Sequence, residues 1–186
     1  GTVESGKDLV AALTQAQVER IDVLILSHLH NDHTGGIKDV FNTFNVDNLI
    51  LPELSTHSEG IYYAEFAINE VTMAKGGVYS ATAGMNFMLG EFEITILASY
   101  GAMADENDRS LVVMAKIEDK KFLFTGDIEA KAERKLLSQN INFDCDVLKV
   151  AHHGSKTSST KDFLAVATPR YSAISLAKDN SFGHPH

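Results

Sequence analysis

The segment Ser27-His28-Leu29-His30-Asn31-Asp32-His33-Thr34-Gly35-Gly36 decides how this chain is interpreted. It places three histidines and one aspartate within six residues, directly after the apolar run 23–26. In an extended segment the side chains of His28 and His30 point the same way, and a turn after them brings Asp32 and His33 to a neighbouring point. Imidazole suits zinc and other first-row divalent metals, and a carboxylate can bridge two ions. The segment therefore predicts a site for two adjacent divalent metal ions.

Helices and strands alternate on both sides of this segment. Apolar residues at helical spacing predict helices over 7–17, 37–44 and 59–75, and short apolar runs predict buried strands over 23–26 and 48–51. Paired glycines at 35–36 and 76–77 interrupt the chain between these elements. The histidine-rich segment is thus expected on a loop that leads from a strand to a helix.

The second half of the chain begins with a series of short β-type segments. Short β-type segments predict an antiparallel meander over 78–81, 86–89, 92–97, 110–117 and 121–124. A charged helix over 129–139 follows, then a buried strand over 146–150, a helix over 159–166 capped by Ser158 or Ser159, and a last strand over 171–175. The alternation indicates an α/β layered domain, and 186 residues with 44% apolar content fit a single domain over 1–186.

Composition limits the partners of the chain. A net charge of −9 disfavours tight, non-specific binding of nucleic acid by the overall surface. No apolar run is long enough to span a bilayer, and no feature indicates an obligate protein partner. The single Cys145 is expected in the core. The chain is expected to be a soluble domain, and both a cytoplasmic and an extracytoplasmic location stay open.

Two further strand ends carry ligand-type residues. Asp127 follows the strand over 121–124, and His152 and His153 follow the strand over 146–150. Ligands of α/β proteins gather at strand ends, although Asp127 could instead cap the helix behind it.

These residues together resemble the metallo-β-lactamase-fold hydrolases, whose pattern His-x-His-x-Asp-His is present at 28–33. Thr-Gly-Asp at 125–127, His-His-Gly-Ser at 152–155 and Gly-His-Pro at 183–185 are similar to one branch of that superfamily. That branch contains the metallo-hydrolase domain of the bacterial DNA-uptake channel protein and the phosphorylcholine esterases. The resemblance covers nearly the whole chain and implies a four-layer αββα sandwich with a two-metal site at the rim of its sheets.

The resemblance also implies a role for each residue of the pattern. His28 and His30 match ligands of the first metal, Asp32 and His33 match ligands of the second, and Asp127 matches the aspartate that bridges both. His153, rather than the adjacent His152, matches the remaining ligand of the second metal, which would leave His152 to support the site or contact substrate. His184 matches a position near the site, suited to a phosphate contact or a proton donor.

The chain departs from the family pattern in two respects. Many members supply a third histidine to the first metal, but here that region contains Asn107 and Asp108, so either of these or a water would complete the shell. Fewer nitrogen ligands make manganese more competitive with zinc. Members also carry strands before and after the matched region, so the domain is expected to be incomplete at both ends.

The predicted chemistry is hydrolysis by a water that two divalent ions, zinc or manganese, activate. Asp32 or Asp127 could accept the proton of that water, and Lys149, Lys156 or Ser155 could bind a phosphate oxygen. The expected substrate is a phosphodiester, either a small molecule or single-stranded nucleic acid. The acidic balance and the absence of tryptophan argue mildly against a nuclease. A lactam, a thioester or another ester stays open as the substrate, and so does a non-catalytic metal-binding or interaction domain.

Overall fold

The computed structural model describes residues 1–177 and 179–186, which form two compact units, Gly1–Ala81 and Thr82–His186. Each unit has its own sheet and its own buried core. The expectation of a single domain over 1–186 stays a prediction. In the described part of the chain, no helix has both the length and the apolar character needed to cross a membrane.

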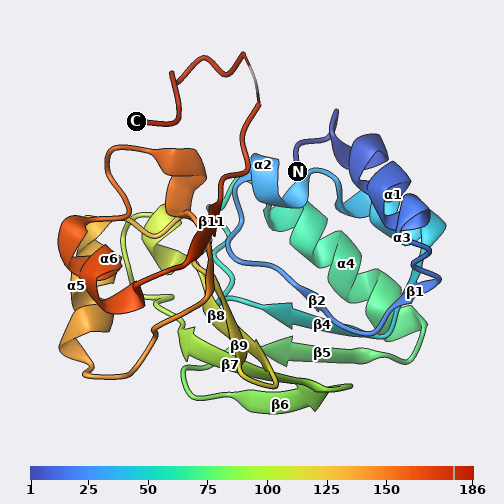
Figure 1. Cartoon of the computed structure of the whole chain (residues 1–186). Coiled ribbons are helices and arrows are strands. Elements are labelled where there is room, and N and C mark those ends of the chain that lie inside the picture. The colour runs from blue at the N-terminus through green and yellow to red at the C-terminus, as the bar shows by residue number, and fades with distance from the viewer. Residues whose placement is uncertain (178) are drawn as a thin grey trace. The chain divides into compact units, whose positions relative to one another are not determined.

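Unit 1 combines helices with a small parallel sheet (Figure 1). Its helices are α1 (Gly6–Gln15), α2 (Asn31–Thr34), α3 (Ile37–Thr43) and α4 (Ile61–Met73). The sheet has the order β2 (Leu24–Ile25), β4 (Asn48–Leu51) and β5 (Gly77–Ser80), and all of its pairs are parallel. A separate parallel pair joins β1 (Arg20–Ile21) to β3 (Asn45–Val46). The strand predicted over 48–51 is confirmed in full.

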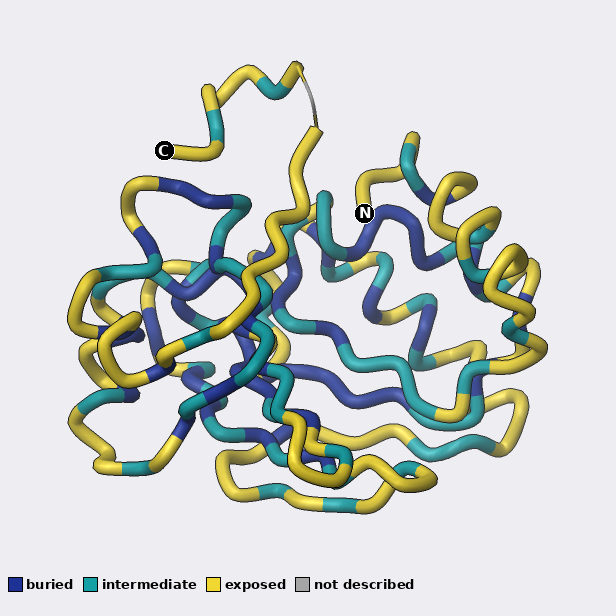
Figure 2. Tube along the Cα trace, viewed as in Figure 1, coloured by how far each residue is buried: buried dark blue, intermediate teal, exposed yellow. Residues whose placement is uncertain are grey.

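The core of unit 1 lies between the sheet and α4. On α4 the fully buried residues are Ala64, Ala67 and Val71, which share one helical face at intervals of three and four residues. Figure 2 shows buried and exposed positions alternating along this helix. The small alanine side chains let the helix pack closely against the strands, where Leu49 is also fully buried. This packing fixes the strand ends from which the candidate ligands project.

One predicted strand belongs to a different sheet from the expected one. The segment 78–81 was predicted as the first strand of an antiparallel meander, but β5 pairs in parallel with β4, Asn48 opposite Gly77 and Leu51 opposite Ser80. The reason is the connection, because α4 carries the chain back along the sheet and a parallel pair needs such a crossover. Hydrophobic spacing alone predicts a strand without identifying its neighbour.

Unit 2 is built on a mixed sheet of the order β11-β10-β9-β8-β7-β6. The antiparallel part comprises β6 (Asn86–Leu89), β7 (Phe92–Ala98), β8 (Val112–Ile117) and β9 (Lys120–Phe124), which confirms the meander over these strands. The strands β10 (Val147–Lys149) and β11 (Tyr171–Ala173) then add in parallel. The helical elements are η1 (Asn107–Arg109), α5 (Ala130–Ser138), η2 (Ala151–Gly154) and α6 (Lys161–Ala167).

The core of unit 2 gathers aromatic and aliphatic side chains under α5 and α6. Phe143 and Phe163 stack with ring centroids 5.2 Å apart, and both are almost completely buried. Cys145 is buried as expected, and its thiol donates to the carbonyl of Ala167 at 3.5 Å. Burial, assisted by the neighbouring carboxylates, raises the pKa of this thiol to about 11. Cys145 is therefore a core residue with little thiolate character.

The helix caps differ from those that the sequence indicated. Ser158 or Ser159 was expected to cap α6, but the cap is Thr160, whose hydroxyl accepts from the amide of Phe163 at 3.4 Å. For α5, one oxygen of Asp108 accepts from the amides of Glu129 and Ala132, at 2.8 and 3.3 Å. A residue 21 positions upstream thus satisfies the first turn of α5, a role that sequence reasoning had considered for Asp127.

Candidate metal centre

The first group of ligand-type side chains lies in unit 1, after β2. It was expected on a loop, but the segment divides into an extended part that ends at His30 and the short helix α2 over Asn31–Thr34. The hydroxyl of Thr34 donates to the carbonyl of His30 at 3.0 Å and closes this turn. His28 and Leu29 are both fully buried, so the extended part of the segment lies in the core of unit 1.

The imidazoles of this group converge. His28 Nε2 and His30 Nδ1 lie 3.1 Å apart, and the rings of His28 and His33 have centroids 4.1 Å apart. The hydroxyl of Ser27 lies 3.2 Å from His28 Nδ1 and 3.3 Å from His33 Nδ1, and a carboxylate oxygen of Asp32 lies 3.7 Å from His33 Nε2. Two ring nitrogens at hydrogen-bond distance can share one proton or bind one cation. The predicted convergence of the first cluster is thus present within unit 1.

A glycine holds this segment against α4. Gly60, the residue before α4, donates its amide to the carbonyl of Leu29 at 2.7 Å. A Cβ at this position would meet the hydroxyl of Thr34 and the carbonyl of Leu29. The close approach therefore requires glycine at position 60, which sequence reasoning did not identify, because nothing in the local sequence distinguishes this glycine from any other before a helix.

The second group of ligand-type side chains lies in unit 2 around Asp127, which is 2% exposed. Its amide donates to the hydroxyl of Ser110 at 2.9 Å. One carboxylate oxygen lies 3.1 Å from His153 Nε2, and the other lies 3.3 Å from the ammonium of Lys149. That ammonium also donates to the carbonyl of Gly126 at 3.0 Å. The buried Asp127 carboxylate thus faces a ring nitrogen of His153 on one side and the ammonium of Lys149 on the other.

The two adjacent histidines of η2 point to different neighbours. Both have left-handed backbone, with φ of 48° at His152 and 54° at His153. His153 Nδ1 lies 2.6 Å from the carbonyl of Ser175, so this nitrogen carries the proton and leaves Nε2 toward Asp127. His152 Nδ1 instead lies 3.1 Å from a carboxylate oxygen of Glu129. Of the two histidines, His153 is therefore the one that lies beside Asp127. That His153 binds a metal stays a prediction.

Lys149, Ser155 and His184 are among the residues predicted for substrate contact or proton transfer. Lys149 is engaged with Gly126 and Asp127, as described above. The hydroxyl of Ser155 lies 2.9 Å from that of Thr157 and accepts the Thr157 amide, so it belongs to a turn. The ring of His184 stacks on Phe182 and lies 5.9 Å from the ring of His152.

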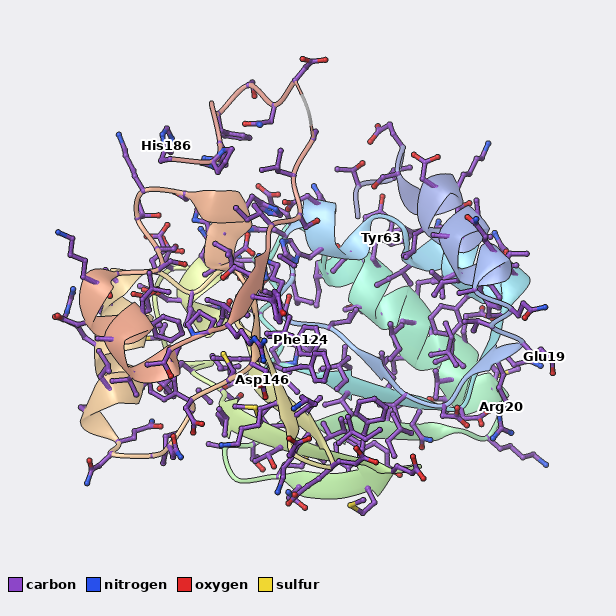
Figure 3. All side chains as sticks on the ribbon, viewed as in Figure 1. Glu19, Arg20, Tyr63, Phe124, Asp146 and His186 are labelled. Atoms are coloured by element: carbon purple, nitrogen blue, oxygen red, sulfur yellow. The ribbon has the colours of Figure 1, made fainter. Side chains whose placement is uncertain are left out.

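His184 stands in a cluster of imidazoles on the C-terminal segment, whose last residue, His186, is labelled in Figure 3. Desolvation, followed by the neighbouring His186, His152 and His153, lowers the pKa of His184. Its Nδ1 is buried and, among the described residues, has no hydrogen-bond partner. The imidazole is thus held in its neutral form, which can accept a proton or a hydrogen bond from a bound group.

The region that lacks the third histidine contains Asn107 and Asp108, and both side chains form hydrogen bonds within unit 2. Asp108 is 3% exposed, and its Oδ1 accepts the amides of Glu129 and Ala132 at the start of α5. Asn107 Nδ2 lies 3.5 Å from a carboxylate oxygen of Glu129, and its Oδ1 is buried without a hydrogen-bond partner among the described residues. Of the two residues expected near the first metal, Asn107 thus has a buried side-chain oxygen that no hydrogen bond from the described residues uses.

Two glutamates of unit 2 have partners that their sequence positions do not indicate. Glu129 contacts His152, and Glu133 is completely buried on α5. The sequence predicts a charged helix over 129–139 with Ala132, Leu136 and Leu137 on one face, and this spacing does not indicate which of its acidic side chains are buried. Their partners include His152, Ser159 and Thr160, which lie more than 20 positions further along the chain.

The sequence profile of the metallo-beta-lactamase superfamily matches residues 2–178. The chain belongs to the metallo-beta-lactamase superfamily. Among curated relatives, it is 28% identical over 181 residues to ComE operon protein 3 of Bacillus subtilis, with 97% of this chain and 23% of that protein covered. It is 30% identical over 187 residues to competence protein ComA of Neisseria gonorrhoeae, with 100% of this chain and 24% of that protein covered. The chain therefore spans about a quarter of the length of these relatives.

Solved structures show the same fold at low sequence identity. A metallo-beta-lactamase from Cronobacter sakazakii superposes with a TM-score of 0.55 at 15% identity, covering 80% of this chain and 63% of that one. The Rm3 metallo-beta-lactamase gives 0.53 at 17% identity, covering 82% and 65%. The predicted α/β metallo-β-lactamase fold and the predicted superfamily are thus confirmed, while the αββα layering stays a prediction. Membership of this superfamily makes metal-dependent hydrolysis the function class of this chain. Its histidines and aspartates are residue types that bind divalent metal ions.

Proposed function

We propose that this domain hydrolyses phosphodiester bonds with two divalent metal ions. The ligands would be His28, His30, Asp32, His33, Asp127 and His153. The observation that carries the proposal is the pairing of ligand atoms within each unit. His28 Nε2 and His30 Nδ1 lie 3.1 Å apart in unit 1, and His153 Nε2 lies 3.1 Å from an Asp127 oxygen in unit 2. Superfamily membership supports metal binding by residues of these types.

The donor set fits divalent metal by its chemistry. His28 is fully buried and Asp127 is 2% exposed, yet both are polar, which is typical of side chains that serve a bound ion or an internal network. The proton that His153 donates to the Ser175 carbonyl leaves a lone pair on Nε2, the arrangement common in metal-binding histidines. Imidazoles with carboxylates suit zinc and manganese. We propose zinc or manganese as the native ions.

When bound, divalent ions lower the pKa of water toward neutrality and polarise a phosphoryl oxygen. Asp32 and Asp127 are the carboxylates that could take up the proton released there. Lys149, 3.3 Å from an Asp127 oxygen, supplies a positive charge beside the reacting group. The ring centroids of His184 and His152 lie 5.9 Å apart, and both imidazoles are proposed to contact the phosphate. Ser155 is the weaker of the proposed phosphate contacts, since its hydroxyl serves a turn.

The proposed substrate class rests on the relatives. These are ComE operon protein 3 of Bacillus subtilis, competence protein ComA of Neisseria gonorrhoeae and recombination protein 2 of Haemophilus influenzae, and recombination acts on nucleic acid. The net charge of −9 favours a small phosphodiester or a short single strand over duplex DNA bound along the surface. Both substrates share the same scissile bond, and an assay can separate them.

The test combines metal analysis with turnover. We expect two zinc or manganese ions per chain and metal-dependent hydrolysis of bis-p-nitrophenyl phosphate, lost on chelation and restored by the same metal. A parallel assay with a labelled single-stranded oligonucleotide distinguishes a nuclease from an enzyme of small phosphodiesters. A protein that binds two ions yet cleaves neither substrate would refute the phosphodiesterase proposal.

A matched pair of variants tests the ligand assignment. His30→Ala should abolish metal-dependent turnover and reduce the amount of metal bound. The far-UV circular dichroism should stay unchanged, because His30 is only half-buried. His57→Ala, which removes an exposed histidine of the same unit, should behave like the unmodified protein. Full turnover in His30→Ala after chelation and metal addition would remove His30 from the site.

A second candidate is a non-catalytic metal-binding or interaction domain. It is favoured by the absence of a third histidine in the region of Asn107 and Asp108, where Asp108 Oδ1 caps α5. A site with a full shell of protein ligands would favour the structural role, and an open water position would favour the enzyme. Metal binding without turnover on phosphodiester, lactam and thioester substrates would select this candidate.

A further inference from the structure

Glu133 is a completely buried carboxylate that the proposed chemistry does not use. It lies in the first turn of α5, and both of its oxygens accept hydrogen bonds from the segment before α6. One oxygen accepts the amide of Ser159 at 2.5 Å. The other accepts the amide of Thr160 at 2.9 Å and its hydroxyl at 2.6 Å. A charge in the interior that is bonded in this way is retained for the partners it holds in place.

The segment that Glu133 holds is the end of the loop that carries His152 and His153. Its backbone is unusual, because His152, His153 and Ser159 all have φ between 48° and 54°, the left-handed region that side chains other than glycine rarely adopt. Such conformations persist only where surrounding contacts determine them. The bonds of Glu133 to Ser159 and Thr160 are contacts of this kind at the C-terminal end of the loop.

Further bonds connect the same helix to the middle of the loop. The amide of Ala130 donates to the carbonyl of Thr157 at 3.0 Å, and the hydroxyl of Thr157 donates to a carboxylate oxygen of Glu129 at 2.9 Å. Within the loop, the amide of Ser155 donates to the carbonyl of His152 at 2.8 Å. The first turn of α5 therefore holds the loop at successive points between His152 and α6.

We propose that Glu133 is a positioning residue that fixes the loop 152–160 and so keeps His153 Nε2 at 3.1 Å from Asp127. The ring of His153 is held by the Ser175 carbonyl on one side, but its backbone direction depends on the loop. A loop released from Glu133 would relax from the left-handed conformation and move the ring from Asp127. This inference rests on the proposed function where it concerns metal, and on the structure alone where it concerns the loop.

The test compares Glu133→Gln with Leu136→Ala in titrations with cobalt(II) alone, followed by visible absorption. The glutamine side chain has an NH₂ group in place of one carboxylate oxygen, so in Glu133→Gln this group faces the backbone amide of either Ser159 or Thr160 and cannot accept its hydrogen bond. Supporting partners of ligands change metal affinity by about 10 to 100-fold, and we expect a loss in this range. Leu136→Ala removes a fully buried side chain of the same helix and should lower stability while leaving cobalt affinity unchanged. Equal cobalt affinity in Glu133→Gln and the unmodified protein would overturn the proposal.

A second readout needs no metal. Hydrogen exchange of the Ser155 amide should become faster in Glu133→Gln relative to amides of β7 and β8, whereas Leu136→Ala should raise exchange throughout unit 2. Failure of the unmodified protein to bind cobalt would count against the proposed function, while the exchange result would still decide the role of Glu133. Unchanged exchange at Ser155 overturns that role.

The Thr160 variants decide the matter if Glu133→Gln does not fold. Thr160→Ala removes one of the three bonds to Glu133, and Thr160→Ser keeps both that bond and the helix cap. We expect weaker cobalt binding and faster Ser155 exchange in Thr160→Ala, with values for Thr160→Ser close to those of the unmodified protein. Identical behaviour of the two Thr160 variants would overturn the proposal.

Discussion

Replacement of Asp108 tests whether this residue caps a helix or binds a metal. Its side chain is 3% exposed, and Oδ1 accepts the amides of Glu129 and Ala132 at the start of α5. Asp108→Ala removes both acceptors, whereas Asp108→Asn keeps an oxygen at the same place and removes only the charge. The two variants therefore separate the hydrogen bonds of the cap from its electrostatic contribution.

The magnitudes follow from the groups left without partners. Loss of a capping side chain costs about 0.5–2 kcal/mol. An unsatisfied buried donor costs about 1–3 kcal/mol, and the amide of Ala132 belongs to a residue that is 0% exposed. We expect Asp108→Ala to lower the free energy of unfolding by about 2–4 kcal/mol, a large share of the roughly 5–15 kcal/mol typical of a domain. Asp108→Asn should cost about 0.3–1 kcal/mol, because only the interaction of the charge with the helix dipole is lost.

Urea denaturation of the chelator-treated proteins, followed by circular dichroism, measures these differences without a metal contribution. A cost below about 1 kcal/mol for Asp108→Ala would refute the capping argument. So would equal costs for the two variants. Bound metal should be unchanged in Asp108→Asn, and a loss of metal at unchanged stability would instead identify Asp108 as a ligand.

Three further predictions concern packing and reactivity. Phe163→Ala should lower the free energy of unfolding by about 3–5 kcal/mol in the same urea assay, because it removes the ring stacked on Phe143, and Phe163→Leu should lose much less. Gly60→Ala should cost about 1–3 kcal/mol, since its Cβ would meet Thr34 and Leu29, and an unchanged midpoint would contradict that close approach. Burial raises the pKa of Cys145 to about 11, so only about one thiol in a thousand is ionised at pH 8. Iodoacetamide should therefore label Cys145 slowly in the native protein and rapidly in urea, and rapid native labelling would contradict its placement in the core.

Local features of the sequence determined the function class and much of the secondary structure. The ligand-type residues at 28–33 are adjacent in the chain, so their convergence depends mainly on one turn, and the structure has it within unit 1. The strand over 48–51 and the helices near 7–17, 37–44 and 59–75 were predictable because hydrophobic periodicity is also a local property.

The tertiary structure decided what depends on partners distant in the chain. Only strand pairing shows that β5 lies beside β4, since the same apolar residues could face either sheet. The orientation of His153 toward Asp127 follows from a left-handed loop whose conformation is fixed by bonds to α5, and no residue near His153 encodes those bonds. Asp108 and Glu133 resemble ordinary surface acids in the sequence. They are buried because backbone amides at 129, 132, 159 and 160 satisfy their oxygens, and the chain folds those amides into place from 21 to 27 residues away.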